Sequence, residues 1–351
     1  MSEKRYDYII VGAGLFGAVF AHLMRAKGNS CLIIDRRSHI GGNCYSENIE
    51  GIEVHKYGPH IFHTKDKEIW DFVNQFGEFN RYTHRAKANY NGNLYSFPIN
   101  LETYKEVYGF TNPQAAKKHG TPYGIYEMFY LGYSRKIWGE SLENISKDVL
   151  NRIPRRYNFN DSYYEYNEHQ GIPVKGYTDL IQKMLRGTDV MLNTDYFENK
   201  KEFYERANKI VYTGSVDELL DFRYGELPYR GLCFKETKKN VDDFQGIAQI
   251  NYTDSTIPYL RTIEHKHFMF NYQHDYSIVT YEYPEKHADE LNLPVVKCYP
   301  VYSEANRALY KKYYDDINHE KHIIGGRLGE YRYMNMDETI KSAIEKAENE
   351  I

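Results

Sequence analysis

An apolar run at 8–11 opens the clearest pattern in the chain. It passes directly into a glycine-rich turn and then into a segment over 18–26 with the spacing of an amphipathic helix. A second apolar run at 31–34 ends in an acidic residue, Asp35. The order of strand, glycine turn, helix and strand is typical of a parallel α/β sheet that binds a dinucleotide.

The turn reads GAGLFG from position 12 to position 17. Gly12 allows the tight turn, Gly14 lets the backbone approach a diphosphate, and Gly17 lets the helix pack on the strand. The diphosphate then meets free N–H groups at the helix N-terminus. Asp35 follows about 20 residues downstream, where an acid should hold a ribose hydroxyl. We therefore predict a cofactor site that includes Gly12, Gly14, Phe16, Gly17 and Asp35.

A second glycine signal follows the acid at once. The stretch RRSHIGGN starts at Arg36 and closes on Gly41-Gly42 before Asn43. Taken alone, Gly41-Gly42 is also compatible with an ordinary turn. Together, the two stretches resemble those of FAD-binding chains of the glutathione-reductase and amine-oxidase type. That resemblance predicts FAD as the cofactor, with Arg36, Gly42 and Asn43 among its contacts.

Alternation of apolar and polar residues predicts the remaining strands. Asn91-Gly92 indicates a hairpin over 86–98, because this pair favours the tightest hairpin turn. The apolar run at 209–214 predicts a strand that rejoins the nucleotide-binding sheet. Short alternating segments between 232 and 283 predict a mainly antiparallel sheet.

Composition limits the classes of function. A chain of 351 residues with net charge -4 is long enough for two or three lobes and has no bulk basic field for nucleic acid. No apolar run approaches about 18 residues and no signal-peptide pattern opens the chain, so we expect a cytoplasmic protein without a membrane partner. The four cysteines are scattered, which predicts neither disulfides nor a metal site. The 36 tyrosines suit a wet cavity for a polar, planar ligand.

Three groups of side chains are candidates for chemistry, each with an alternative. His60 and His63 have no acidic or cysteine partner nearby, so a cofactor or substrate pocket and core packing are both preferred to a metal site. The aromatic residues over 126–139 fit either a core or a base-stacking platform. The stretch RIPRRY, with Arg152, fits either a solvated face or pairing with a diphosphate.

Eight stretches in order then resemble the bacterial UDP-galactopyranose mutase family over nearly the whole chain. They are YDYIIVGAGLFGAV, HIGGNCY, HKYGPHIFHT, GYSRKIWG, RIPRRY, QGIPVKGYTDLI, RTIEHKHF and GGRLGEYRY. The resemblance implies an α/β fold with a Rossmann-type FAD-binding domain, a reduced helical domain and an antiparallel β-sheet domain, interleaved along the chain. The implied ranges are 1–84, 205–226 and 318–351 for FAD, 100–150 for the helical domain, and 85–99, 151–204 and 227–317 for the substrate domain.

The resemblance also implies the activity. It predicts an isomerase of the intramolecular transferase type that interconverts the pyranose and furanose forms of a nucleotide sugar. Catalysis would be covalent, through N5 of reduced FAD, without net redox change. UDP-galactose is the family's default substrate, and UDP-N-acetylgalactosamine, UDP-arabinose or a GDP-heptose are alternatives, as are an amine-oxidase-like oxidoreductase and a flavin-bound sensor. A role in capsule or lipopolysaccharide biosynthesis is expected.

Site residues follow from the same resemblance. Arg152 and Arg261 match the arginines that flank the diphosphate, and His60 and His63 match residues beside the flavin. The implied substrate contacts are Phe129, Tyr130, Tyr133, Trp138, Tyr163, Tyr299 and Tyr333. Arg327, Tyr333 and His60 are further implied cofactor contacts.

Three departures from the family pattern stand out. The helical region is shorter between Pro113 and Tyr126. Because this region usually supplies the dimer contact in the family, the sequence does not decide whether the protein forms a homodimer. Asn335 replaces an aspartate, and His84 stands where asparagine is usual. Both positions are predicted substrate contacts, so the exact sugar and base stay open.

Overall fold

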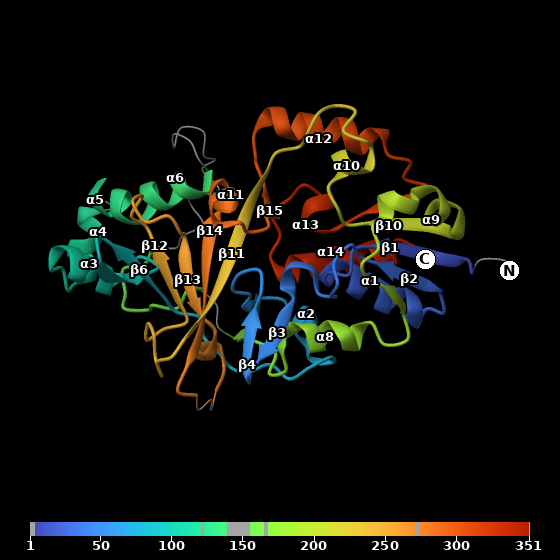
Figure 1. The fold of residues 1–351 in the computed structure, drawn as a ribbon. Coiled ribbons are helices and arrows are strands. Elements are labelled where there is room, and N and C mark those ends of the chain that lie inside the picture. The colour runs from blue at the N-terminus through green and yellow to red at the C-terminus, as the bar shows by residue number, and fades with distance from the viewer. Residues whose placement is uncertain are drawn as a thin grey trace.

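The computed structural model describes residues 4–120, 123–138, 155–164, 168–270, 272 and 274–350. It confirms the predicted α/β class. Two lobes lie side by side, one built on a parallel sheet beside both chain termini and one on an antiparallel sheet with short helices at its far edge (Figure 1). Among the described helices, none is both long and apolar enough to cross a bilayer.

The parallel sheet has five strands in the order β16-β10-β1-β2-β9. These are β1 (Tyr6–Val11), β2 (Cys31–Ile34), β9 (Asp189–Met191), β10 (Ala207–Tyr212) and β16 (His322–Ile324). Side chains alternate between two buried faces: Ile10 packs with helices α1 (Leu15–Ala26) and α14 (Met336–Glu348), and Ile9 packs on the opposite face. Helices α9 (Lys200–Arg206) and α12 (Glu304–Asp316) cover that opposite face.

One segment lies elsewhere than the family-based ranges suggest. Strand β9 pairs with β2 in the parallel sheet, and α8 (Gly176–Met184) packs against α1, although 151–204 was expected in the substrate domain. The strand is three residues long and only two of them are apolar, so no periodicity marks it in the sequence.

The second sheet has seven strands in the order β15-β11-β14-β13-β12-β6-β7. They are β6 (Ala86–Tyr90), β7 (Asn93–Phe97), β11 (Tyr229–Lys239), β12 (Gln249–Tyr252), β13 (Arg261–Glu264), β14 (Ser277–Pro284) and β15 (Val296–Pro300). All neighbours are antiparallel except β12 and β6, which confirms the mainly antiparallel prediction. Asn91 and Gly92 both have positive φ, 50° and 80°, as the predicted hairpin turn requires.

Short helices cover the outer edge of this sheet. They are α3 (Leu101–Tyr108), α4 (Pro113–His119), α5 (Tyr123–Tyr126), a π-helical turn η2 (Glu127–Leu131) and α6 (Gly132–Trp138). Asn100 caps α3 in a capping box with Thr103, and Asn112 caps α4, where Pro113 takes the first helical position. Phe129 and Tyr104 share the buried core of this edge.

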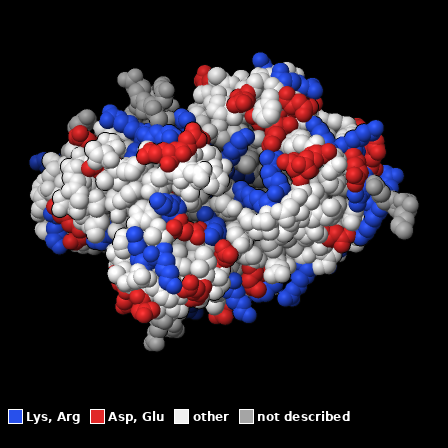
Figure 2. Space-filling model, in the orientation of Figure 1, with Lys and Arg blue, Asp and Glu red and all other residues white. Residues whose placement is uncertain are grey.

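Smaller elements join the two sheets. Strands β3 (Ser46–Ile49) and β4 (Ile52–His55) form one hairpin, and β5 (Phe62–Thr64) pairs with β8 (His169–Gly171). The short helices are α2 (Lys67–Asn74), α10 (Val216–Leu219), α11 (Ala288–Leu291) and α13 (Gly326–Gly329). The 3-10 turns are η1 (Gly42–Cys44), η4 (Tyr196–Asn199), η5 (His265–Phe268) and η6 (Glu285–His287). The face in Figure 2 is hollowed near the boundary between the lobes, and Lys and Arg side chains lie around the hollow.

Candidate functional site

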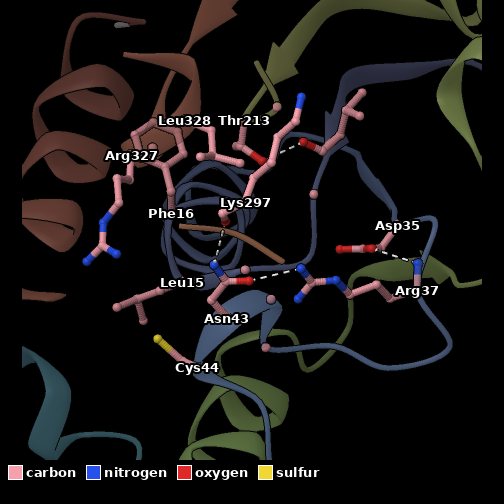
Figure 3. A pocket seen from close by; sticks show the side chains of 18 of the residues that line it. Leu15, Phe16, Asp35, Arg37, Asn43, Cys44, Thr213, Lys297, Arg327 and Leu328 are labelled. Carbon is pink, nitrogen blue, oxygen red and sulfur yellow. Dashed lines mark hydrogen bonds between the residues drawn. The ribbon is translucent and has the colours of Figure 1, made fainter. Parts of the chain in front are cut away.

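A cavity of about 510 Å³ opens at the carboxyl ends of the parallel strands, where an open α/β sheet binds its ligands. Strand β15 of the other sheet closes one side (Figure 3). Ten of the predicted cofactor contacts line it: Gly12, Gly14, Phe16, Gly17, Asp35, Arg36, Gly42, Asn43, His60 and Arg327. The eleventh, Tyr333, lies beside Arg327.

The two glycine turns meet at the floor of the cavity. The Gly41 N–H donates to the Ala13 carbonyl at 2.8 Å, and a Cβ on Gly42 would lie 2.9 Å from the Gly14 Cα. Gly12 has φ of 115°, and a Cβ there would lie 2.0 Å from Thr213 Oγ1. Helix α1 begins at this point without an acidic residue in its first turn. The cradle therefore fits the diphosphate of an extended dinucleotide.

Asp35 ties the two turns together. Its Oδ2 accepts the Ala13 N–H at 2.8 Å and its Oδ1 accepts the Arg37 N–H at 2.9 Å. Each carboxylate oxygen has a second lone pair, so a ribose hydroxyl can still be bound.

Arg36 has acidic partners of its own. It pairs with Glu218 at 2.9 Å and with Asp195 at 3.7 Å. Because both carboxylates come from elements distant in sequence, the stretch RRSHIGGN alone could not show that the charge of Arg36 is already compensated.

Arg37, Thr213 and Lys297 also line the cavity, although they were not among the predicted contacts. Arg37 donates from its guanidinium to Asn43 Oδ1 at 2.9 Å, and Asn43 Nδ2 donates to the Lys297 carbonyl at 3.3 Å (Figure 3). Thr213 faces Gly12 from the end of β10. Arg37 was adjacent to a predicted contact, but Lys297 lies on a strand of the other sheet, and no sequence signal marks it.

Arg327 connects this cavity to a group of tyrosines. Its guanidinium lies 5.5 Å from the Tyr299 ring and 5.0 Å from the Tyr333 ring, and it donates to the Met334 carbonyl. The two rings stack at 5.8 Å. Three predicted site residues, two from the stretch GGRLGEYRY and one from β15, thus meet beside the cofactor cavity.

Arg261 is a fixed cation close to Tyr299. Its Nε donates to Glu282 Oε2 at 2.8 Å. Burial opposes the guanidinium charge, but Glu282, Tyr133 and Tyr299 together raise the pKa of Arg261 well above its ordinary value. Burial also raises the pKa of Tyr133 and of Tyr299, so both hydroxyls keep their protons and can donate hydrogen bonds.

His84 is buried and His60 is half-buried, and both lie near the same arginine. Burial, together with the charge of Arg261, lowers the pKa of His60 to about 4 and that of His84 to about 3. His60 Nδ1 donates to the Gly58 carbonyl at 2.8 Å, so its Nε2 carries the free lone pair of the neutral ring. The His63 ring instead stacks on Tyr164, with centroids 3.7 Å apart.

The two residues that depart from the family pattern, Asn335 and His84, lie in different surroundings. Asn335 is the N-cap residue of α14, where its backbone N–H donates to Glu338 Oε2 at 2.7 Å. The ring of His84 lies 5.0 Å from that of Tyr163, whose N–H donates to the His84 carbonyl at 2.7 Å.

The predicted base platform is largely internal. Phe129 is fully buried against Tyr95, and Tyr130 is buried with its ring stacked on Tyr126 at 5.5 Å. Core packing thus accounts for Phe129, one of the two alternatives for this aromatic run. Arg152 and the side chain of Trp138 lie outside the described residues.

Comparison with known proteins shows which family this chain resembles. The sequence model of UDP-galactopyranose mutase matches residues 128–333, and that of an NAD(P)-binding Rossmann-like domain matches residues 10–76. The chain is 35% identical over 370 residues to a dTDP-fucopyranose mutase of Escherichia coli, covering 97% of both chains. It is 34% identical over 369 residues to a probable UDP-galactopyranose mutase of Klebsiella pneumoniae, covering 97% of this chain and 94% of that one.

A solved structure agrees in fold. The crystal structure of a reduced UDP-galactopyranose mutase superposes with a TM-score of 0.71 at 14% identity, over 98% of this chain and 95% of that one. Sequence relatives that span almost the whole chain, together with the family match, settle the assignment. The chain belongs to the UDP-galactopyranose mutase family of isomerases, and its Rossmann-type domain is a site for FAD.

Proposed function

We propose that this protein interconverts the pyranose and furanose forms of a nucleoside-diphosphate sugar, with no net redox change. One observation carries the proposal. Arg327 lines the cofactor cavity and also touches Tyr299 and Tyr333, while the fixed cation Arg261 lies close to Tyr299. A diphosphate that leaves the sugar and later returns needs such a group beside the cofactor.

The chain's own residues would divide the work as follows. When bound and reduced, FAD supplies a nucleophilic nitrogen, N5, for covalent catalysis. Arg261 would hold the diphosphate, since Glu282 fixes the direction of its guanidinium. Tyr299 and Tyr133 would donate hydrogen bonds to diphosphate oxygens, because both hydroxyls stay protonated. His60 would offer an uncharged acceptor beside the flavin.

The remaining predicted residues extend this arrangement. We assign Arg152 to the opposite side of the diphosphate and His63 to the flavin side of the pocket. We assign Tyr163 to the diphosphate, and the following to the nucleoside and sugar: Tyr130, Trp138, His84 and Asn335. These roles follow from the family resemblance together with the positions of the described residues.

The sugar nucleotide is proposed as UDP-galactose or dTDP-fucose, the substrates suggested by the names of the two relatives at 34% and 35% identity. The identities do not separate them. UDP-N-acetylgalactosamine, UDP-arabinose and a GDP-heptose complete the panel to be tested. We also propose that the enzyme acts in the cytoplasm and supplies a furanose sugar for capsule or lipopolysaccharide biosynthesis, as the resemblance implies.

The test is incubation of the FAD-loaded protein with each of these sugar nucleotides, with and without dithionite, followed by chromatographic separation of the two ring forms. We expect a new ring isomer from one or two donors, and only after reduction. Oxygen consumed in proportion to substrate would point to the oxidoreductase instead. Binding without any isomer under full reduction would point to the sensor.

A further inference from the structure

Helix α6 lies directly on the turn that leads into the strand of Arg261. Gly132, its first residue, packs so closely that a Cβ there would lie 2.0 Å from the Thr253 carbonyl oxygen. Tyr133 and Ile137 pack against the core cluster that includes Leu260, the residue before Arg261. One helix thus contacts both the start and the end of the turn over 253–260.

A lysine is buried in this contact. Lys136 is 5% exposed, and its Nζ donates to the carbonyl oxygens of Tyr252, Ile257 at 3.3 Å and Tyr259 at 2.9 Å. An ammonium has three N–H donors, so the three carbonyls occupy all of them. A buried charge is unfavourable unless it is fully bonded, so a position that served packing alone would take an apolar residue.

The carbonyls that Lys136 binds belong to the backbone that sets the position of Arg261. The Tyr252 N–H donates to the Leu260 carbonyl at 2.8 Å, and the Leu260 N–H donates to the Glu282 carbonyl at 2.7 Å. Glu282 in turn holds Arg261. Lys136 therefore fixes the helix of Tyr133 to the same turn that presents the arginine.

We propose that Lys136 is a positioning residue for nucleotide-sugar binding, which holds Tyr133 beside Arg261 by bonding α6 to the turn at 252–260. The assignment rests on the proposed function, because it presumes that Tyr133 and Arg261 contact the substrate. Lys136 acts through the side chains of Tyr133 and Arg261. All three of its N–H donors bond to backbone carbonyls, so none is left for a ligand.

The experiment compares Lys136→Met with Arg135→Met, a matched change of the exposed residue next to it on α6. UDP and dTDP are titrated into FAD-loaded protein by calorimetry, and steady-state constants are measured with the preferred sugar. For Lys136→Met we expect Kd and KM to rise about tenfold while kcat changes less than about twofold. FAD content and the flavin spectrum should stay those of the wild type, and Arg135→Met should change none of these values.

Unchanged Kd and KM in a folded Lys136→Met protein would overturn the proposal. If that variant does not yield FAD-loaded protein, Gly132→Ala decides, because its Cβ would push α6 off the Thr253 carbonyl while Lys136 stays intact. Weakened diphosphate binding supports the proposal, and wild-type binding overturns it.

Hydrogen exchange separates this inference from the proposed function. Even if the wild type bound neither UDP nor dTDP, faster exchange at 252–260 and 132–138 in Lys136→Met, but not in α1, would support the bonding of helix to turn. Equal exchange in both proteins would overturn it.

Discussion

Arg261 and Glu282 form a buried ion pair across neighbouring strands β13 and β14, with Nε and Oε2 2.8 Å apart and Glu282 1% exposed. Such a pair is weak evidence for stability, because removing two charges from water is costly. Its value here is geometric. The carboxylate fixes the direction of a guanidinium that still has donors free for a ligand.

Arg261→Ala should reduce kcat/KM by about three orders of magnitude, because a charged contact to a diphosphate in a buried site is worth roughly 4 kcal/mol. FAD should still bind, since the cofactor cradle is built from other residues. Steady-state kinetics and the flavin spectrum together measure this. Arg223→Ala, which breaks an exposed pair with Asp316, is the control and should leave kcat/KM unchanged. Near-normal turnover in Arg261→Ala would rule out the proposed diphosphate contact.

Gly42→Ala should lose FAD. Its φ is 55°, and the new Cβ would lie 2.9 Å from the Gly14 Cα, where the two turns meet. Gly92→Ala is the matched control, because its φ of 80° imposes similar backbone strain of about 1 kcal/mol, with nothing within 4 Å of the added Cβ. The FAD content of the purified proteins checks this. Full FAD occupancy in Gly42→Ala would contradict the closeness of the two turns.

Acidification should destabilise the protein through His60 and His84. Their folded-state pKa values, about 4 and about 3, lie below the unfolded value of 6.5, so the unfolded state binds more protons as the pH falls below 6.5. Each ring should then cost about 1.4 kcal/mol of unfolding free energy per pH unit down to its folded-state pKa. Denaturant unfolding between pH 7.5 and pH 5 measures the slope. His84→Asn should remove the contribution of one proton, about 1.4 kcal/mol per pH unit, from that slope. An unchanged slope would contradict the burial of a neutral ring.

Tyr299→Phe should raise KM for the sugar nucleotide about tenfold, because one neutral hydrogen bond is worth about 1 kcal/mol and somewhat more to a charged acceptor. The stacking on Tyr333 needs no hydroxyl and should persist. Tyr229→Phe is the control: its hydroxyl donates to the Leu328 carbonyl at 2.9 Å, so its loss should lower Tm without raising KM. The same KM in wild type and Tyr299→Phe would remove Tyr299 from the diphosphate site.

Local features of the sequence predicted the strand, glycine turn and helix that line the cavity. The turn at 12–17 and the acid at 35 lie within one strand-turn-helix-strand unit, so their spacing alone indicates the geometry. Asn91-Gly92 predicted its hairpin for the same reason. Lys297, by contrast, reaches the cavity only because β15 of one sheet packs beside η1 of the other lobe.

The other contacts that the sequence did not predict join residues that are far apart along the chain. The partners of Arg36 come from α10 and from the residue before η4, and Arg261 meets Glu282 only when β13 and β14 pair. Spacing within one element carries no information on such contacts. For Arg261, the family resemblance supplied a prediction that periodicity could not.

The most direct test of isomerase activity counts the molecules of isomer that are formed for each reduced flavin. The flavin is reduced once under anaerobic conditions, excess reductant is removed, and the furanose or pyranose form of the preferred sugar nucleotide is added. We expect many molecules of isomer per reduced flavin, with the flavin spectrum still that of the reduced form at the end. Reoxidation of one flavin for each molecule of substrate converted would contradict an isomerase and establish net redox turnover.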